Sequence, residues 1–400
     1  MKRSITAILS ALCLLLGLCP TAVFAAAGEI RLYAAPAACG SGDGSSPQNA
    51  ARLWDHSLWQ TVRKQLQSAP VTLELAAGKY VTTYPAKPDT RLNLIDIGHP
   101  EHTLTIRGAA GNASCFMRDP ADSKDAIPKN RNLQNLVTVR KNCRNIVFEQ
   151  LYFTGSGMCG YALQIRESRD ITLRNCHWKD MRGVYYGASG AWRSHNVTWE
   201  NCTFANIGCD VHAHVLYNLS NCTGLTLRNC RLSDSYGDFV RFRDRVRDVI
   251  VENCEFIDNG LYDSSPFLAF PLFIDFEQPD QYEYFSTGLT VRNNKFIFKK
   301  QAPRNWMMAF HISGYNPPEW QYLVNRKDAA AMAKMSRPEL RQYLDTRFGL
   351  QTGRIFFSGN TLENAADAVV YECWPKYGSE KKFPPEDYRN TISLTHAFID

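Results

Sequence analysis

The sequence contains no long block of basic residues and, after its first residues, no long apolar run. Nucleic-acid sites usually carry dense lysine and arginine clusters, so we expect no nucleic-acid partner. A membrane-spanning helix needs about 20 consecutive apolar residues, so we expect no membrane partner either. Cysteine is not rare, with 13 residues in 400, but the chain is far longer than the small scaffolds that depend on disulfides. A globular protein with a core of its own is therefore the expected class.

The first residues have the pattern of a secretory signal peptide. Lys2 and Arg3 precede a short apolar run, and small residues surround Ala25. We therefore predict that residues 1–25 are removed and that residues 26–400 form one domain, secreted or periplasmic. Loss of the two basic residues lowers the formal net charge from +6 to about +4, which suits an acidic partner without requiring one.

A repeat of about 25 residues runs through the centre of the chain. Each copy alternates apolar and other residues, reaches an Asn followed by Cys or Asn, and ends on an aromatic residue or Leu, which predicts a strand, a corner and a second strand. No helical pattern separates the strands, so the copies are expected to stack as coils of a parallel β-helix. The copies are NIVFEQLYF at 145, DITLRNCHW at 170, NVTWENCTF at 196, GLTLRNCRL at 224, DVIVENCEF at 248, GLTVRNNKF at 288 and a degenerate RIFFSGNTL at 354.

Two columns of identical residues follow from this stacking. Asparagine tolerates the left-handed conformation of a sharp corner, and stacked amides can bond to one another. The corner asparagines are Asn175, Asn201, Asn229, Asn253 and Asn293. The next column, Cys176, Cys202, Cys230 and Cys254, is expected to fill the core as small buried hydrophobes. A zinc site is not expected there, because metal ligands converge on a point and these lie along a line.

The pairing of the other cysteines stays open. Without Cys13 and Cys19 of the signal peptide, 11 of the 13 cysteines remain, so at least one is unpaired or pairs between molecules. Cys209 with Cys222 and Cys143 with Cys159 are two pairs that could form, and Cys39 and Cys115 have no obvious partner.

The pattern resembles the pectate-lyase-like superfamily of right-handed parallel β-helices. The repeats cover roughly 145–370, and the segment GSGDGSSPQNAARLW, a helical stretch HSLWQTVRKQLQSA and the strand VTLELAAGKYV precede them. The resemblance implies an all-β, single-stranded right-handed parallel β-helix with an N-terminal segment and capping helix over 26–110 and coils over about 102–374. Many activities share this fold, so function must come from a site.

A helical insertion is predicted near 325–349, between the last two repeats. Ser336 and Glu339 form a capping box, and Gly349 follows the helical pattern. Insertions of this kind often line a binding face, so Tyr343 could reach the substrate.

A further strand is expected in each coil, and the resemblance implies that its outer face forms the substrate groove. The candidate strands lie at 161–168, 211–218, 238–244, 272–278, 308–315 and 368–374. In FVRFR, alternation buries Val240 and Phe242 and turns Arg241 and Arg243 outward. The same rule turns outward His212, His214, Asp275, Glu277 and His311. Adjacent coils would then present histidines, arginines and carboxylates in one stripe.

This stripe suits eliminative cleavage of a uronic-acid polysaccharide. Arg241 and Arg243 can hold the substrate carboxylate, because a guanidinium forms a bidentate pair with it. His214 is the preferred base, with His212 and His311 as alternates, because histidine titrates near neutral pH. We therefore predict a polysaccharide lyase, monomeric and acting on an acidic polysaccharide.

Other residues are predicted to bind the substrate rather than to react with it. Asp275 and Glu277 could contact the sugar, orient a histidine or hold Ca²⁺, although two carboxylates on one strand are a weak calcium signal. Trp306 could stack on a sugar ring. No catalytic residue of a known lyase family can be transferred to a position of this sequence.

Three alternatives remain open at this point. A glycoside hydrolase on the same fold could use Asp275, Glu277 and Asp238 as paired carboxylates. A non-catalytic β-helix could bind sugar through aromatic residues. Finally, Arg241 and Arg243 could serve only to neutralise Asp275 and Glu277 in an ion-pair ladder between coils.

Overall fold

A computed structural model describes residues 28–82, 90–119, 134–209, 212–243, 246–262, 267–270, 287–299, 310–312, 339, 355–363 and 391–394. The predicted signal peptide and nearly all of the predicted insertion at 325–349 lie outside these residues. Within them, no helix is long and apolar enough to cross a membrane.

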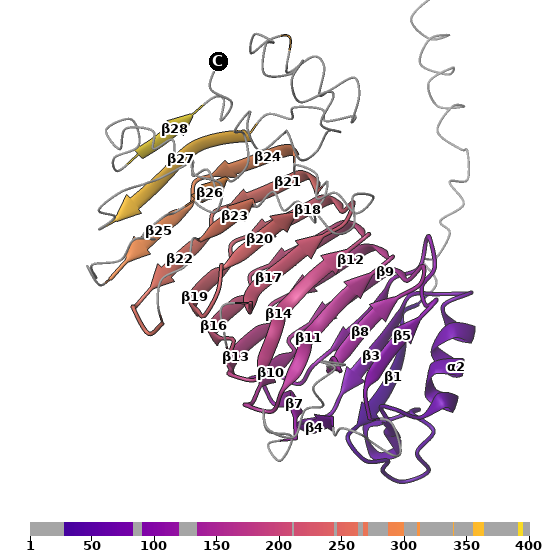
Figure 1. The fold of residues 1–400 in the computed structure, drawn as a ribbon. Coiled ribbons are helices and arrows are strands. Elements are labelled where there is room, and N and C mark those ends of the chain that lie inside the picture. Colours follow the sequence, from indigo (N-terminus) through magenta and orange to yellow (C-terminus); the bar gives the residue numbers. More distant parts are fainter. Residues whose placement is uncertain are drawn as a thin grey trace, which may run out of the picture.

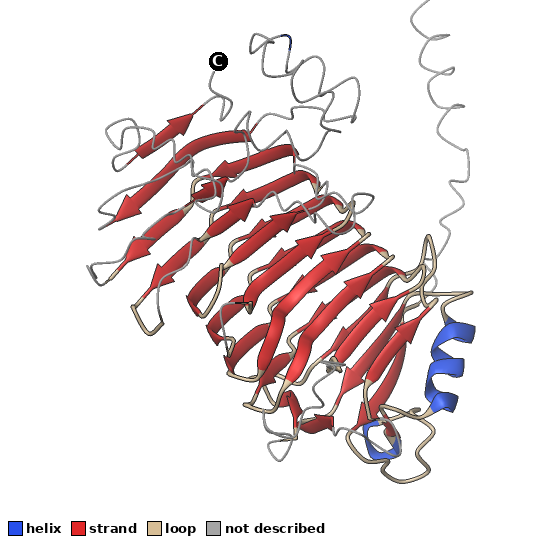
Figure 2. Cartoon of the chain, in the orientation of Figure 1, coloured by secondary structure: helices blue, strands red, loops and turns tan. Residues whose placement is uncertain are grey.

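The chain winds as a parallel β-helix with three strands in each coil (Figures 1 and 2). One coil consists of β11 (Cys159–Arg166), β12 (Arg169–Arg174) and β13 (His177–Met181). The next consists of β14 (Val184–Trp192), β15 (His195–Glu200) and β16 (Thr203–Ile207), and each of its strands pairs in parallel with its counterpart. Repetition of this pairing gives three sheets along the molecule.

Sheets 1 and 2 take the first and second strands of each repeat. Sheet 1 consists of β1 (Ile30–Ala35), β3 (Val71–Leu75), β6 (Leu104–Arg107), β9 (Arg144–Glu149), β12, β15, β18 (Thr223–Arg228), β21 (Arg247–Glu252), β24 (Thr287–Arg292) and β27 (Ile355–Glu363). Sheet 2 consists of β4 (Gly78–Thr82), β7 (Ser114–Arg118), β10 (Tyr152–Thr154), β13, β16, β19 (Arg231–Ser235), β22 (Glu255–Asp258) and β25 (Lys295–Phe298). They are continuous through β27, which pairs with both β24 and β25. Two short strands lie at the ends: β2 (Ala51–Arg52) pairs with β1, and β28 (Thr391–Leu394) pairs antiparallel with β27.

Sheet 3 contains the strands that were expected between the repeats. It consists of β5 (Leu92–Ile95), β8 (Val137–Arg140), β11, β14, β17 (His214–Leu219), β20 (Val240–Arg243), β23 (Leu268–Phe270) and β26 (Phe310–Ile312). The predicted strand at 272–278 is wrong as the partner of β20, because β23 occupies that place. The sequence also failed to indicate β14, which is rich in Gly, Ala and Ser and has no clear alternation.

The predicted capping helix is confirmed as α2 (His56–Gln65), preceded by the 3-10 turn Pro47–Asn49. Its apolar face buries Leu58, Trp59 and Val62 against the first coils, at the end of the molecule where Figure 1 shows α2. The Trp59 indole donates a hydrogen bond of 2.7 Å to the carbonyl of Leu53. The helix thus covers core residues that the first coil would otherwise expose.

The core is a set of stacked rows, one side chain from each coil. Behind sheet 2, rings stack from Tyr80 through Phe116, Phe153 and Trp178 to Phe204, with centroid separations of 4.9, 5.4, 4.9 and 4.5 Å. Like residues recur because parallel strands in register place equivalent side chains one strand spacing apart. This rigid core fixes the outer face of each sheet.

The predicted corner conformation is confirmed. The five corner asparagines have φ between 52 and 56°, in the left-handed region. The cysteine column beside them is buried, and all ten cysteines of the described residues are free, so the two cysteine pairs considered are wrong. A hydrogen bond between stacked amides is found in the cysteine column, not in the corner column. There, Asn294 follows Cys254 and donates to Asn360 at 2.9 Å.

Candidate functional site

The strand register of sheet 3 aligns two columns of residues, which contain the outward side chains of its central strands. The first runs through Thr138, Gln164, Gly190, Tyr217, Arg241, Ala269 and His311. The second runs through Arg140, Arg166, Trp192, Leu219 and Arg243. Val240 and Phe242 are buried as predicted, which turns Arg241 outward. Neither column contains a carboxylate among the residues that the structure describes.

Arg241 meets a buried histidine and a carboxylate at the start of β17 and β20. Its Nη1 lies 3.5 Å from Nε2 of His214 and 3.4 Å from Oδ2 of Asp238. The other ring nitrogen of His214, Nδ1, lies 3.3 Å from the carbonyl oxygen and 3.8 Å from Oδ2 of Asp238. The three side chains form one cluster, to which we refer as the Arg241 cluster. Neighbouring residues on the two chain segments hold it in place, because the amide of Leu216 donates a hydrogen bond of 2.9 Å to the carbonyl of Phe239.

The contacts assign the proton on His214. A guanidinium can only donate, so Nε2 faces Arg241 as an unprotonated nitrogen, and Nδ1 carries the hydrogen towards Asp238. This tautomer leaves a lone pair directed to the same place as the Arg241 guanidinium. Burial raises the pKa of the Asp238 carboxyl above its ordinary value, and the charge of Arg241 partly offsets that effect.

The predicted exposure of His214 is wrong. Its side chain is only 2% exposed, because Arg241 of the neighbouring coil and the ring of Tyr217 lie against it. His212 is exposed as predicted, and its ring stacks on Tyr185 with a centroid separation of 5.7 Å.

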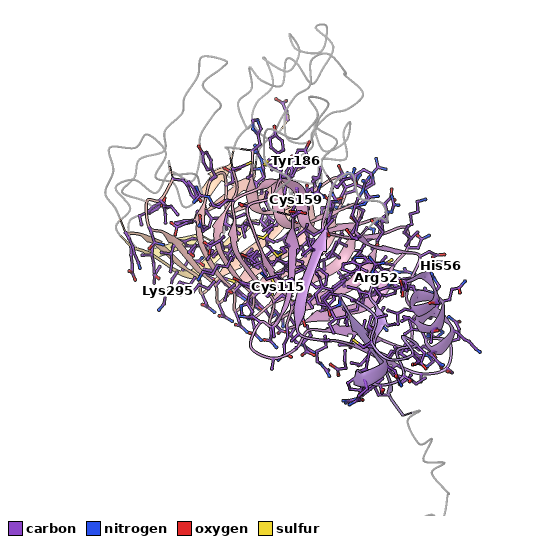
Figure 3. All side chains as sticks on the ribbon, turned by 90° about the horizontal axis from the view of Figure 1, so that it is seen from below. Arg52, His56, Cys115, Cys159, Tyr186 and Lys295 are labelled. Carbon is purple, nitrogen blue, oxygen red and sulfur yellow. The ribbon has the colours of Figure 1, made fainter. Side chains whose placement is uncertain are left out.

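Aromatic rings surround the Arg241 cluster. The ring of Tyr217, the neighbour of Arg241 in register, lies 4.8 Å from that of His214. Tyr186 packs against Tyr185 at 4.9 Å, and Figure 3 shows it near Cys159 on one long side of the molecule, between the ends marked by His56 and Lys295. Aromatic faces of this kind suit the apolar faces of sugar rings.

Glycine at position 190 is required by the close approach of β17. A Cβ atom there would lie 2.1 Å from the carbonyl oxygen of Tyr217 and 3.2 Å from the ring of Tyr161. No side chain therefore projects from the outer face of sheet 3 at Gly190, which lies between Gln164 and Tyr217.

The remaining predicted residues are only partly placed. His311 lies in the same register column as Arg241, with Ala269 between them, and Arg243 lies in the second column beside Leu219. Asp275, Glu277, Trp306 and Tyr343 lie outside the described residues. In the described part of the chain, no group of three or more His, Cys, Asp or Glu side chains is arranged to hold a metal ion.

Sequence reasoning missed Asp238 as the partner of His214, and it missed Tyr217; Trp192 was considered as a sugar-stacking residue, but not as part of sheet 3. The strand register brings Asp238 to His214, but it precedes the alternating part of its strand, so no periodic signal marked it. Trp192 stood in the strand that was not predicted.

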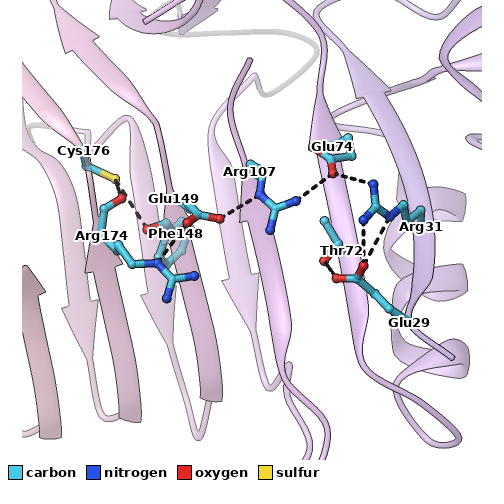
Figure 4. A network of polar contacts seen from close by, with 9 residues as sticks. All are labelled: Glu29, Arg31, Thr72, Glu74, Arg107, Phe148, Glu149, Arg174 and Cys176. Carbon is cyan, nitrogen blue, oxygen red and sulfur yellow. Dashed lines mark hydrogen bonds and ion pairs between the residues drawn. The ribbon is translucent and has the colours of Figure 1, made fainter. Parts of the chain in front are cut away.

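An ion-pair ladder between coils does exist, but on sheet 1. Its column alternates in sign along the register: Glu74, Arg107, Glu149, Arg174, Glu200, Arg228, Glu252 and Arg292. Arg107 donates to Glu149 at 2.7 Å and to Glu74 at 3.0 Å, and Arg174 donates to Glu149 at 3.0 Å (Figure 4). The residue before each corner asparagine in the repeats carries this alternation, which is therefore visible in the sequence, although the ladder was expected on another sheet.

The chain resembles known β-helix proteins. Residues 131–298 match the family model described as "Right handed beta helix region". Among solved structures, pectate lyase Pel9A is 11% identical over 88% of this chain and 79% of its own, with a TM-score of 0.50. This chain therefore has the pectate-lyase-like, right-handed parallel β-helix fold.

Two further solved structures are less similar. An alginate lyase from Paenibacillus sp. str. FPU-7 is 12% identical over 79% of this chain and 93% of its own, with a TM-score of 0.47. The Streptococcus pneumoniae surface protein and adhesin PfbA is 10% identical over 79% of this chain and 84% of its own, with a TM-score of 0.43. No curated protein sequence matches this β-helix chain significantly.

Proposed function

We propose that this β-helix protein is an exported polysaccharide lyase that cleaves an acidic, uronic-acid-containing polysaccharide by β-elimination. The observation that carries the proposal is the Arg241 cluster, in which a guanidinium that can hold a carboxylate lies 3.5 Å from an unprotonated histidine nitrogen. Elimination needs these two groups together, because the carboxylate must be neutralised before the neighbouring C–H bond becomes acidic enough to lose its proton.

The first step is the binding of the substrate carboxylate by Arg241. The side chain of Arg241 is 16% exposed and covers His214, so the guanidinium must turn towards the sugar to form a bidentate pair. This turn uncovers Nε2 of His214 at the place where the neighbouring C–H bond lies. Binding of the substrate carboxylate thus both pairs it with Arg241 and exposes His214, the base.

The second step is the transfer of the proton to His214. The C–H electron pair forms the new double bond as the glycosidic oxygen leaves, and Nε2 keeps the proton. Asp238, beside Nδ1, stabilises the imidazolium that results and holds the ring in place. Tyr217 is the described group that can protonate the leaving oxygen, because a phenol can donate and its ring borders that of His214.

The structural likeness to pectate lyase Pel9A supports this proposal at the level of fold. The charge distribution favours a lyase over a hydrolase. A hydrolase needs two carboxylates flanking the scissile bond, and in the described part of sheet 3 Asp238 is the carboxylate at the site. The Oδ2 atom of Asp238 also lies near both His214 and Arg241, so this carboxylate faces protein groups rather than a scissile bond.

The test is a screen of pectate, alginate and glycosaminoglycans for the absorbance of a new double bond, at about 235 nm. The wild-type protein is expected to give this signal with at least one polymer, and Arg241→Ala and His214→Gln are expected to abolish it. Release of reducing ends from a neutral glycan, with no absorbance change from any acidic polymer, would show a hydrolase instead. Binding with no product of either kind would show a carbohydrate-binding protein.

A further inference from the structure

We infer that the second outer column of sheet 3 is a separate binding stripe for the acid groups of the polysaccharide, away from the Arg241 cluster. The stripe consists of Arg140, Arg166 and Trp192 of that column together with Arg193, which follows Trp192 at the corner after β14, and we refer to it as the arginine–tryptophan stripe. The identity of the ligand rests on the proposed function, whereas the stripe itself is defined by its own charges and contacts.

Two guanidinium groups of the stripe lie over the ring of the same tryptophan. The Cζ atom of Arg166 lies 4.2 Å from the centroid of the Trp192 ring, and that of Arg193 lies 4.3 Å from it. Arg166 and Trp192 are paired in register on β11 and β14, and Arg140 lies one strand further on. Stacking of this kind orients the guanidinium planes and leaves their N–H edges facing solvent.

These arginines have no carboxylate partner among the described residues. The ion pairs of the structure involve other arginines, and none lies within 4 Å of Arg140, Arg166 or Arg193. The nearest acidic residues along the strands, Asp96 and Glu167, lie at the corner beyond the strand ends and are exposed to solvent. Neighbouring arginines without counter-charges repel one another, which destabilises the folded protein. An anionic ligand bound to the row would remove this repulsion.

A carboxylate-bearing polysaccharide fits this surface better than other anions. Successive strands are about 4.8 Å apart, so the arginines form an extended row rather than a pocket for one small ion. Each guanidinium can grip a carboxylate through two hydrogen bonds, and the sugar faces can lie on aromatic rings. The row runs parallel to the column of Arg241 and lies two residues further along each strand. One bent polymer chain can therefore reach both.

The test is equilibrium binding of polygalacturonate and of alginate in the His214→Gln background, which removes cleavage. Arg140→Ala together with Arg166→Ala is expected to weaken binding at least tenfold, and Trp192→Ala by a similar factor. The matched control is Arg174→Ala, an arginine of sheet 1 on the strand after β11 that pairs with Glu149, and it is expected to stay within twofold. Thermal unfolding of each variant checks that the fold is intact, and Trp192→Phe serves as the conservative variant that is expected to keep binding.

Several results would overturn the inference. Unchanged binding by the Arg140/Arg166 double variant, or an equal loss in Arg174→Ala, would show that the stripe is not a binding surface. Equal binding of neutral dextran would show that charge does not matter, and tighter binding of DNA would assign the stripe to nucleic acid. If the wild-type protein binds the polymers through the stripe but never cleaves them, the stripe stands and the proposed lyase activity fails. In a protein that cleaves, the loss in the double variant is expected in KM rather than in kcat.

Discussion

Sheets 1 and 3 carry arginines at the same strand spacing but in opposite surroundings. On sheet 1, the outer column alternates between glutamate and arginine in register from Glu74 to Arg292. On sheet 3, the described part of the two columns carries arginines and no carboxylate, and Asp238, two residues before β20, is the acidic side chain that contacts Arg241. The same residue type is therefore structural on one face and available for a ligand on the other.

The difference shows how a repeat fold separates stability from function. A charge on a stacked column meets the equivalent residue of the coil above and below, so alternating signs are needed for a neutral, stable face. Sheet 1 satisfies this requirement from β3 to β24. Sheet 3 departs from it at the site where three arginines meet aromatic rings, and such departures are most often found where binding occurs.

The largest expected effect separates the two faces by activity. Arg241→Ala is expected to lower the rate of unsaturated product formation by about 10²-fold or more, because it removes the group that neutralises the substrate carboxylate. Arg107→Ala on sheet 1 is the matched control and is expected to keep the rate within twofold. Equal losses in the two variants would mean that the arginines of sheet 3 have no special role.

The next effect comes from giving sheet 3 the charge pattern of sheet 1. Leu219→Glu places a carboxylate in register with Trp192 and beside the arginine–tryptophan stripe. Binding of the acidic polymer is expected to fall about tenfold, because the new carboxylate both neutralises the stripe and repels the ligand. Leu219→Gln, of nearly the same shape, is the control and is expected to bind as the wild type does.

A smaller effect is expected when sheet 1 is given the pattern of sheet 3. Glu149→Gln removes the carboxylate shared by Arg107 and Arg174. The free energy of unfolding is expected to fall by about 1 kcal/mol, because these pairs are partly exposed and solvent screens them. Denaturant titration measures the change, and activity towards the polymer is expected to remain; a loss of activity without a loss of stability would contradict the division of roles.

The smallest effect is a change in how stability depends on pH. Since the folded-state pKa of Asp238 is raised above its ordinary 3.8, this residue contributes stability at pH below 3.8 that is lost as the pH rises through the folded-state pKa. The Asp238→Asn variant has no such pH dependence at this position. The free energy of unfolding of the variant, relative to that of the wild type, is therefore expected to rise between pH 3.8 and neutral. A relative fall over this range would show that Arg241 lowers the pKa more than burial raises it.

The sequence alone was enough to predict the fold, and the reason is physical. Each coil repeats the same corner and core, so the asparagine and cysteine columns appear as a period of about 25 residues that chance does not produce. The capping helix was predictable because its apolar face has the period of a helix.

The site was only partly predictable, because it depends on register at strand ends. Arg241 was placed correctly, since it lies inside an alternating stretch between two buried residues. His214 was expected to be exposed but is buried, because contacts with Arg241 of the neighbouring coil and with Tyr217 depend on packing that alternation does not record. The contacts among His214, Asp238 and Arg241 arise between neighbouring coils, where no local pattern in the sequence records them.

The central claim, that sheet 3 and not sheet 1 receives an acidic polysaccharide, can be tested most directly by arginine-specific labelling followed by mass spectrometry. The His214→Gln protein is labelled with and without the bound polymer. Arg140, Arg166 and Arg193 are expected to react with the reagent when the protein is free and to be protected when the polymer is present, whereas Arg107, Arg174 and Arg292 are expected to react equally in both states. Protection of the sheet 1 arginines, or equal labelling of the sheet 3 arginines in both states, would contradict the account.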